Sequence, residues 1–142
     1  MSNTEKLVIR TIARPAPEKK EDLLEWFCDV FDLAGRNDDV EPIMLMEIAG
    51  NSLSGSGVTS KYLNSKLELP RSTVIYHLNR FIYSGLVIRK GRKYYLRSND
   101  MASTIEELQS EVSRAFDRLI LFAEKLDRMM ESDLNGKGRK SR

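Results

Sequence analysis

Apolar residues recur at alternating intervals of three and four in the last third of this chain of 142 residues. The spacing repeats every seven residues, so it places an apolar stripe along one side of a long α-helix and calls for another helix against it. At ~1.5 Å per residue, a helix over residues 99–134 is roughly 50 Å long, which outreaches a domain of this size. We therefore expect a dimerisation helix; the alternative is a helix packed on the domain core. The stripe consists of Ile105, Leu108, Val112, Ala115, Leu119, Phe122, Leu126 and Met129.

Local signals predict where this helix begins and ends. Ser103 followed by Glu106 forms a capping box, although a start nearer Asn99 is also open. Residues 135–142 are basic, and we expect a disordered tail that either adds weak contact with DNA or is solvated. Four further apolar residues widen the stripe: Phe116, Ile120, Ala123 and Met130.

Residues 70–85 predict another helix, with two different faces. Pro70 suits a first helical turn, and Gly85 suits the left-handed residue that ends many helices. One face is apolar at helical spacing and should meet the core. The opposite face has no acidic residue, which suits contact with a polyanion. The apolar stripe consists of Val74, Leu78, Phe81 and Ile82, and the opposite face carries Arg71, Ser72, Thr73, Tyr76, His77, Asn79 and Arg80.

The formal net charge of +2 conceals a strong segregation of charge along the chain. Residues 59–97 contain nine bases and one acid, a net charge of +8. Residues 15–41 contain nine acids and three bases, and residues 100–134 contain nine acids and four bases, which gives −6 and −5. A partner at close range feels this local charge. One basic block between two acidic stretches indicates a nucleic-acid face.

The N-terminal segments give weaker signals. Residues 1–17 suggest a short arm or strand, to which we assign no function. Residues 18–34 predict a helix closed by Gly35. Its apolar face is wide enough to bury two sides and includes Trp26 and Phe27, which we assign to the core or to a dimer contact.

A further helix is predicted to start from Asp38 or Asp39 as its cap, with Pro42 in its first turn. Residues 50–57 are rich in glycine and serine and predict a flexible connector. They lack the lysine and hydroxyl that end a phosphate-binding P-loop. The inward-facing residues of this helix are predicted to be Ile43, Leu45, Met46 and Ile48.

Thr59 is a good N-cap for a short helix over residues 60–67, with Glu68 and Leu69 forming the turn to the next helix. Two helices joined in this way form a helix-turn-helix unit, whose second helix enters the major groove of DNA. The apolar positions of the short helix are Tyr62, Leu63 and Leu67.

Residues 86–97 predict a β-hairpin, because two β-prone runs flank a turn that contains glycine. The tip is strongly cationic, whereas an ordinary hairpin turn would use Asn or Asp. We expect a wing that contacts phosphate or the minor groove, and the alternative is a solvated tip. The bases at the tip are Arg89, Lys90, Arg92 and Lys93.

Other function classes lack a signal in this sequence. No apolar run approaches the ~20 residues that span a bilayer, and no secretory signal is recognisable, so we expect a soluble protein without a membrane partner. One cysteine, Cys28, fits a reducing cytoplasm; it serves packing or, alternatively, a redox response. Ser72 and His77 are explained by chance on a helix surface, and no catalytic constellation stands out, so we expect no enzyme.

The order of these elements resembles the winged helix-turn-helix transcriptional regulators of prokaryotes, most closely the ArsR type. The resemblance rests on residues 69–78, with Ser-Thr-Val followed by His-Leu, and on Gly-Leu-Val at residues 85–87. It covers residues 40–97, and residues 100–130 only in pattern, and MarR-type regulators share much of it. It implies a mainly α-helical fold with a small β-hairpin wing. It also implies a homodimer on an inverted repeat, with half-sites about 34 Å apart.

Many ArsR-type proteins are metal sensors, and this sequence departs from them. Residues 60–67 contain no Cys-x-Cys, and the last helix contains no histidine. One cysteine and one histidine cannot supply three or four ligands for a soft metal from one chain. We therefore expect no metal and no cofactor, and the sequence identifies no effector.

We expect a sequence-specific regulator of transcription that binds double-stranded DNA as a homodimer, as a repressor. A wing-bearing module for protein–protein contacts in a larger assembly is the alternative. The expected domains are an arm (1–17), a DNA-binding domain (18–98), a dimerisation helix (99–134) and a basic tail (135–142). Arg71 and Arg80 suit guanine edges or phosphates, and Asn79 or His77 suits base edges, unless His77 is a half-buried packing residue. The DNA-binding candidates are Ser60, Lys61, Lys66, Arg71, Ser72, Thr73, Tyr76, His77, Asn79, Arg80, Arg89, Lys90, Arg92 and Lys93; the dimerisation candidates are Trp26, Phe27 and the eight stripe residues.

Overall fold

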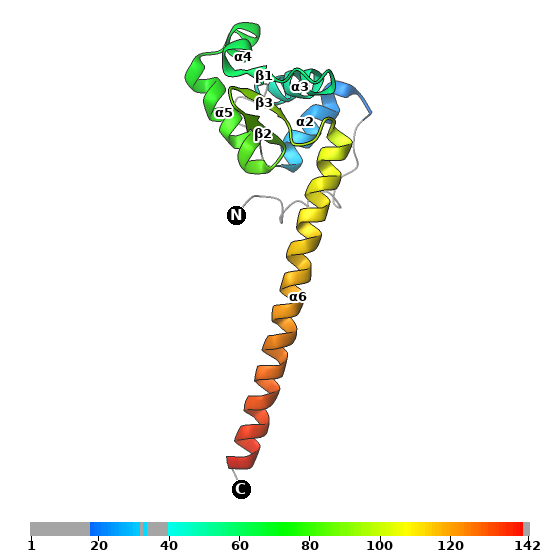
Figure 1. Ribbon diagram of the computed structural model, residues 1–142, viewed down its shortest axis with the longest axis vertical. Helices are drawn as coiled ribbons and strands as arrows, with labels where there is room; N and C mark the ends of the chain where they lie inside the picture. Colours follow the sequence, from blue (N-terminus) through cyan, green and yellow to red (C-terminus); the bar gives the residue numbers. More distant parts are fainter. Residues whose placement is uncertain (1–17, 32, 34–39, 141–142) are drawn as a thin grey trace. The chain divides into compact units, whose positions relative to one another are not determined.

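The computed structural model describes residues 18–31, 33 and 40–140 (Figure 1), with side chains described up to residue 136. The chain divides into two units, the first ending at Leu108 and the second starting at Gln109. The predicted arm, the helix end at Gly35 and the cap at Asp38 or Asp39 lie outside the described residues.

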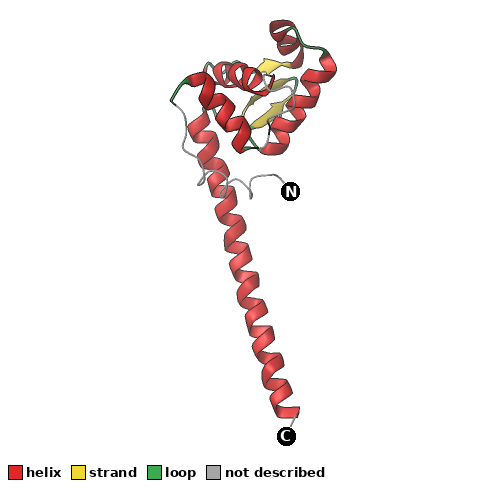
Figure 2. Cartoon of the chain, turned by 180° about the vertical axis from the view of Figure 1, so that it is seen from behind, coloured by secondary structure: helices red, strands yellow, loops and turns green. Residues whose placement is uncertain are grey.

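The described residues are mainly helical, with one small antiparallel sheet (Figure 2). No described helix combines the length and the apolar character that crossing a bilayer requires. The elements in chain order are α2 (Lys20–Val30), α3 (Val40–Leu53), β1 (Val58–Thr59), α4 (Ser60–Leu67), α5 (Arg71–Ser84), β2 (Val87–Lys90), β3 (Lys93–Leu96) and α6 (Met101–Lys140).

The predicted hairpin is confirmed, and a third strand joins it. β2 and β3 are antiparallel, with Val87 opposite Leu96 and Lys90 opposite Lys93. Gly91 supplies the positive φ of 63° that the two-residue turn requires. β1 pairs with the other edge of β3, which gives the order β1-β3-β2. Two residues are too few to show the alternation that predicts a strand, so β1 was not expected.

The turn between α4 and α5 is tightly specified. The hydroxyl of Thr59 accepts a hydrogen bond from the backbone N–H of Tyr62 at 3.0 Å, which confirms the predicted cap of α4. Glu68 ends α4 in the left-handed conformation with φ 52°, which is uncommon outside glycine. The side-chain amide of Asn64 donates to the carbonyl of Leu69. α5 therefore begins in a fixed place beside α4, with Pro70 as its N-cap.

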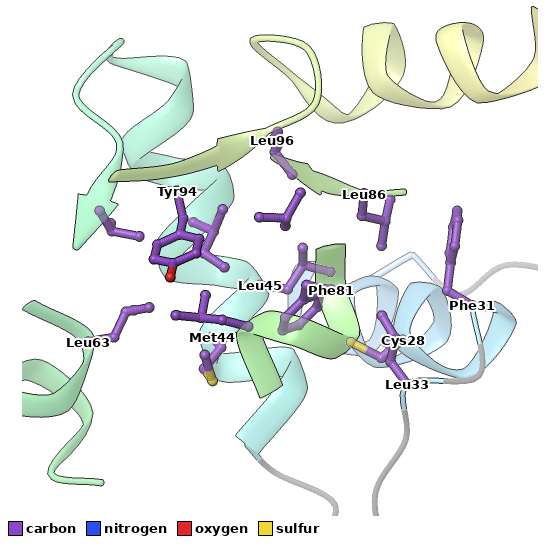
Figure 3. Packing of buried hydrophobic residues seen from close by; sticks show 14 of the residues in the cluster. Cys28, Phe31, Leu33, Met44, Leu45, Leu63, Phe81, Leu86, Tyr94 and Leu96 are labelled. Carbon is purple, nitrogen blue, oxygen red and sulfur yellow. The ribbon is translucent and has the colours of Figure 1, made fainter. Parts of the chain in front are cut away.

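The core of the first unit brings together side chains from α2, α3, α4, α5 and the sheet (Figure 3). α3 packs against α2 and against the strands β1 and β3, while α5 packs against α4 and β2. Val74, Leu78 and Phe81 are fully buried, as the helical spacing of residues 70–85 predicted. The fourth residue of that stripe, Ile82, is 37% exposed, because it lies at the edge of the buried face.

Two other predicted apolar faces were partly wrong. In α3, Leu45 and Ile48 are buried as expected, but Ile43 is 44% exposed and Met46 is half-buried. The buried face is instead the one on which Glu41, Met44, Leu45, Ile48 and Ser52 recur at helical spacing. α3 also continues to Leu53, so the predicted connector is reduced to residues 54–57. In α4, Leu63 is buried and Leu67 is half-buried, whereas Tyr62 is 39% exposed because its hydroxyl donates to Glu47 at 2.7 Å.

Three helix ends also differ from the predictions. α2 runs from residue 20 to residue 30 instead of 18 to 34, because the N–H of Leu33 turns back to the carbonyl of Cys28 at 2.7 Å. The capping box at Ser103 is wrong, since the N–H of Ser103 is itself bonded to the carboxylate of Asp100 at 2.7 Å. That bond lowers the pKa of Asp100. α6 continues to residue 140, so the predicted disordered tail is wrong for residues 135–140: extending an existing helix requires no new nucleation.

Gly85 offers a direct test of this packing. Its φ is 91°, and a Cβ atom there would lie 2.8 Å from Cδ2 of Leu108. We expect Gly85→Ala to lower the free energy of unfolding by about 1–3 kcal/mol, because both the backbone and the contact would be strained. Urea denaturation measures the change.

Gly50 provides the matched control, because it lies inside α3 with nothing within 4 Å of an added Cβ. Gly50→Ala should raise the free energy of unfolding by about 0.5–1 kcal/mol. Equal effects of the two substitutions would contradict the described turn at Gly85.

Candidate nucleic-acid interface

An open groove of about 810 Å³ lies where β1, the start of α4, the start of α5 and the hairpin meet. Four of its lining residues are basic, and they come from three different elements. None of its lining residues is acidic. The turn at Glu68 and the pairing of β1 with β3 bring these elements together. The groove is lined by Thr59, Ser60, Lys61, Asn64, Arg71, Ile75, Arg89, Arg92 and Tyr94.

The bases of the hairpin are held by contacts within it. The guanidinium of Arg89 lies 5.5 Å from the centre of the Tyr94 ring, and its Nε donates to the carbonyl of Gly91 at 2.8 Å. The ammonium of Lys90 lies 5.5 Å from the centre of the Tyr95 ring. A cationic side chain that is already held over an aromatic ring loses less conformational entropy on binding an anion than a side chain that moves freely. Tyr94 and Tyr95 thus position the cations of the tip, a role that their β-prone pattern did not reveal.

Two bases of the block contact carboxylates from outside it. Nε of Arg97 lies 2.9 Å from Oε1 of Glu107, near the start of α6. Nη1 of Arg80 lies 3.7 Å from Oε1 of Glu41. Among the described residues, no carboxylate lies within 4.0 Å of the other seven bases. Those seven side chains are exposed: Lys61, Lys66, Arg71, Arg89, Lys90, Arg92 and Lys93.

Glu41 was not among the residues predicted to lie at this site. It is 1% exposed, and its Oε1 lies 3.0 Å from Nδ1 of His77. The alignment does not meet hydrogen-bond geometry, so the contact is electrostatic. Arg80 approaches the same oxygen and also lies over the ring of Tyr76 at 5.7 Å. His77 and Arg80 thus link α5 to α3.

The surroundings of His77 act on its pKa in opposite directions. Burial lowers the pKa below the ordinary value of 6.5, and the nearby charge of Arg80 lowers it further. Glu41 opposes both, but the net direction is downward. The side chain is 12% exposed, which agrees with a half-buried position. The neutral imidazole is therefore the favoured form in the folded chain.

The other DNA-binding candidates divide clearly by exposure. On α5, Arg71, Ser72, Tyr76 and Asn79 are exposed, while Thr73 is half-buried. Ser60 is half-buried at the start of α4. The structure therefore brings five of the fourteen candidates together in the groove lining, namely Ser60, Lys61, Arg71, Arg89 and Arg92, and turns His77 and Arg80 toward Glu41.

The dimerisation candidates do not share one environment. Trp26 and Phe27 are partly buried against the core of the first unit, with their rings 5.2 Å apart in an edge-to-face contact. Leu108 is part of that core, and Ile105 packs against it. The stripe residues of the second unit from Leu119 onward are 55% to 61% exposed. The seam is thus used inside the first unit up to Leu108.

Other kinds of site find little support. Within the residues that the structure describes, no three His, Cys, Asp or Glu side chains are grouped so that they could hold a metal ion. Cys28 is 1% exposed, and burial, with Glu41 and other acids nearby, raises its pKa to about 12. A buried thiol with so high a pKa is a packing residue in the folded state.

Comparison of the chain with models of protein families, with curated proteins and with solved structures found no match. The function is therefore inferred from the groove, its cations and the exposed face of α5.

The lowered pKa of His77 predicts a pH dependence of stability. Between the folded pKa and 6.5 the unfolded chain binds more protons than the folded chain. The free energy of unfolding contributed by His77 should therefore be complete above pH 6.5 and decrease as the pH falls below it. We expect His77→Gln to make the pH dependence shallower in urea denaturation between about pH 5 and pH 8.

The difference between wild type and variant isolates His77 from the other titrating groups. If the wild type instead gained stability relative to His77→Gln as the pH fell, the attraction of Glu41 for the imidazolium would outweigh burial.

Proposed function

We propose that the first unit binds double-stranded DNA sequence-specifically as a winged helix-turn-helix regulator of transcription, with α5 as the recognition helix and the β2–β3 hairpin as the wing. The observation that carries the proposal is the groove without acidic lining residues, in which Lys61, Arg71, Arg89 and Arg92 surround the start of α5. A group of cations without nearby acids attracts a phosphate backbone more strongly than it attracts a neutral ligand.

The arrangement divides the contacts into two kinds. The major groove of B-DNA is about 12 Å wide and admits an α-helix. Exposed residues of α5 would then meet base edges, with Arg71 directed to guanine and Asn79 to adenine. Lys61, Arg89 and Arg92 would meet phosphates, next to the N-terminus of α4, whose backbone N–H groups favour anions.

The contacts of His77 and Arg80 with Glu41 support a different role for these two residues. A base that already contacts a buried carboxylate is less available to a nucleic acid. We assign His77 and Arg80 to positioning α5, and Arg71, Ser72, Tyr76 and Asn79 to reading the sequence. A chain of this kind acts as a homodimer on an inverted repeat, where it blocks access to a promoter.

The phosphate contacts predict the salt dependence of binding. We expect Arg89→Ala combined with Arg92→Ala to weaken binding to every duplex by a similar factor. The slope of log Kobs against log salt concentration should become shallower by about 2, because each phosphate contact contributes ~0.9. Fluorescence anisotropy at several salt concentrations measures both quantities.

Lys20→Ala is the matched control, since Lys20 is an exposed base on α2 beside Glu21. It should change the slope little. A wild-type chain that binds no duplex at low salt would reject the proposal and favour the module for protein–protein contacts.

Arg71 predicts the specificity of binding. Duplexes selected by the wild-type chain from a random pool would serve as the preferred site. We expect Arg71→Ala to reduce the preference for this site over a scrambled duplex by about 5–150-fold, the equivalent of roughly 1–3 kcal/mol. Lys66→Ala should leave the preference unchanged, because Lys66 is an exposed base of α4 away from the groove lining. If the two variants behaved alike, Arg71 would be a phosphate contact.

A further inference from the structure

The exposed side of α5 carries a stripe of uncharged residues. At ~100° per residue, the four members of the stripe fall within about 60° of one another around the helix. α5 contains two arginines, of which Arg71 is its first residue and Arg80 approaches the buried Glu41. Guanine is most often read by arginine or lysine, so the stripe lacks the side chain that guanine prefers. The stripe consists of Ser72, Tyr76, Asn79 and Tyr83.

Tyr76 is held in place by the two residues that contact Glu41. The guanidinium of Arg80 lies 5.7 Å from the centre of the Tyr76 ring, and its Nη1 donates to the Tyr76 hydroxyl at 3.5 Å. The ring of His77 meets the Tyr76 ring edge-to-face, with the two centres 5.0 Å apart. His77 and Arg80 both approach Oε1 of Glu41. A ring that is held in this way loses little conformational entropy when a base packs against it.

An exposed, uncharged ring suits one group in the major groove of DNA. Tyr76 is 57% exposed, so much of its ring can meet a base. The C5-methyl group of thymine is the apolar group that base pairs present in the major groove. Removing this methyl group and the ring from water is favourable, whereas a polar base edge against the ring would lose hydrogen bonds with water. The Tyr76 ring therefore favours thymine over the other bases.

Asn79 extends this preference to the base that pairs with thymine. It follows Tyr76 by three residues, and side chains at this spacing are neighbours on a helix, with Cβ atoms ~5–6 Å apart. The side chain of an asparagine can form two hydrogen bonds with N6 and N7 of adenine. Because adenine pairs with thymine, Tyr76 and Asn79 suit the same A·T pair or two adjacent ones.

We propose that Tyr76 determines specificity by packing its ring against the C5-methyl group of a thymine, next to an adenine bound by Asn79. Each half-site then contains an A·T pair that cannot be exchanged for G·C without loss of affinity. The proposal rests on the proposed function of α5 as the recognition helix. The observation that carries it is the exposed Tyr76 ring, held by Arg80 and His77 on an uncharged stripe.

Removal of a single methyl group from the DNA tests the proposal. Duplexes selected by the wild-type chain from a random pool are resynthesised with each thymine replaced in turn by deoxyuridine, which lacks only the C5-methyl group. At one thymine of a half-site the wild-type affinity should fall about fourfold, the effect of burying one methyl-sized group. Fluorescence anisotropy measures the two dissociation constants. Selected duplexes in which no thymine responds would overturn the proposal, whereas a chain that binds no duplex rejects the proposed function itself and this proposal with it.

Variants of α5 assign the methyl effect to one residue. Tyr76→Ala should bind the thymine and deoxyuridine duplexes equally, while Tyr76→Phe should keep the fourfold difference because the ring remains. Tyr83→Ala is the matched control, and it should also keep the difference. Tyr83 is 55% exposed on the same stripe, but it lies in the last turn of α5, whereas recognition helices contact base edges through their N-terminal residues.

The ratio of the two dissociation constants is measured with one protein sample, so a partial loss of folded protein cancels. A fourfold ratio that persists in Tyr76→Ala would overturn the proposal. Loss of the ratio in Tyr76→Phe would overturn it by assigning the contact to the hydroxyl instead of the ring. Loss of the ratio in Tyr83→Ala would overturn the assignment of the methyl effect to Tyr76.

Discussion

The buried carboxylate of Glu41 is the constraint on which the placement of α5 depends. A carboxylate that is 1% exposed needs positively polarised groups beside it, because burial of an unpaired charge is very costly. His77 and Arg80 are the groups that approach it, and both belong to α5. The helix is thereby held at one rotation about its own axis. With His77 and Arg80 turned inward, Ser72, Tyr76 and Asn79 of the same helix remain on the outside.

The second constraint is a set of hydrogen bonds and turns that connect the helices to one another and to the sheet. Glu68 adopts a left-handed backbone that ends α4, and Asn64 reaches across the turn to Leu69. On the other side, Ser52 near the end of α3 accepts a hydrogen bond from the N–H of Leu96 at 2.8 Å. These contacts hold α3, α4, α5 and β3 in fixed relation. The cations of the groove therefore belong to rigid elements, which is the condition for recognising a regular array of charge.

The sequence predicted the elements of the first unit well, because their signals are local. Thr59, Gly85 and the cationic hairpin act through their own backbone neighbours, and each was confirmed in position. Apart from helix ends and the short strand β1, the errors concern contacts between distant segments. Ile43 and Tyr62 were assigned to the core by hydrophobicity, but the buried face of α3 is set by what it meets in α2 and β3. The partner of His77 and Arg80 could not be predicted, because 35 residues lie between Glu41 and His77 along the chain.

The long helix was predicted from its heptad spacing, and its start at Met101 agrees with the alternative start near Asn99, whereas its end was not predicted. Asp100 caps it instead of Ser103, and it continues beyond residue 134. The spacing also did not reveal that the stripe has two environments. Leu108 is buried in the core of the first unit, while Leu119 is 60% exposed. Heptad spacing predicts that a residue packs against an apolar surface, but it does not predict whether that surface belongs to the same chain or to another one.

The buried Cys28 can serve as a probe of transient opening of the core of the first unit. Because burial raises its pKa to about 12, the thiol stays almost entirely protonated at pH 8 while the core is closed. The thiolate is the form that attacks an alkylating reagent, so modification requires a transient opening that brings water to α2. Since the chain has a single cysteine, the rate of its alkylation reports on that opening without an engineered label. It gives the population of the open state when reclosing is faster than alkylation, and the rate of opening when alkylation is faster.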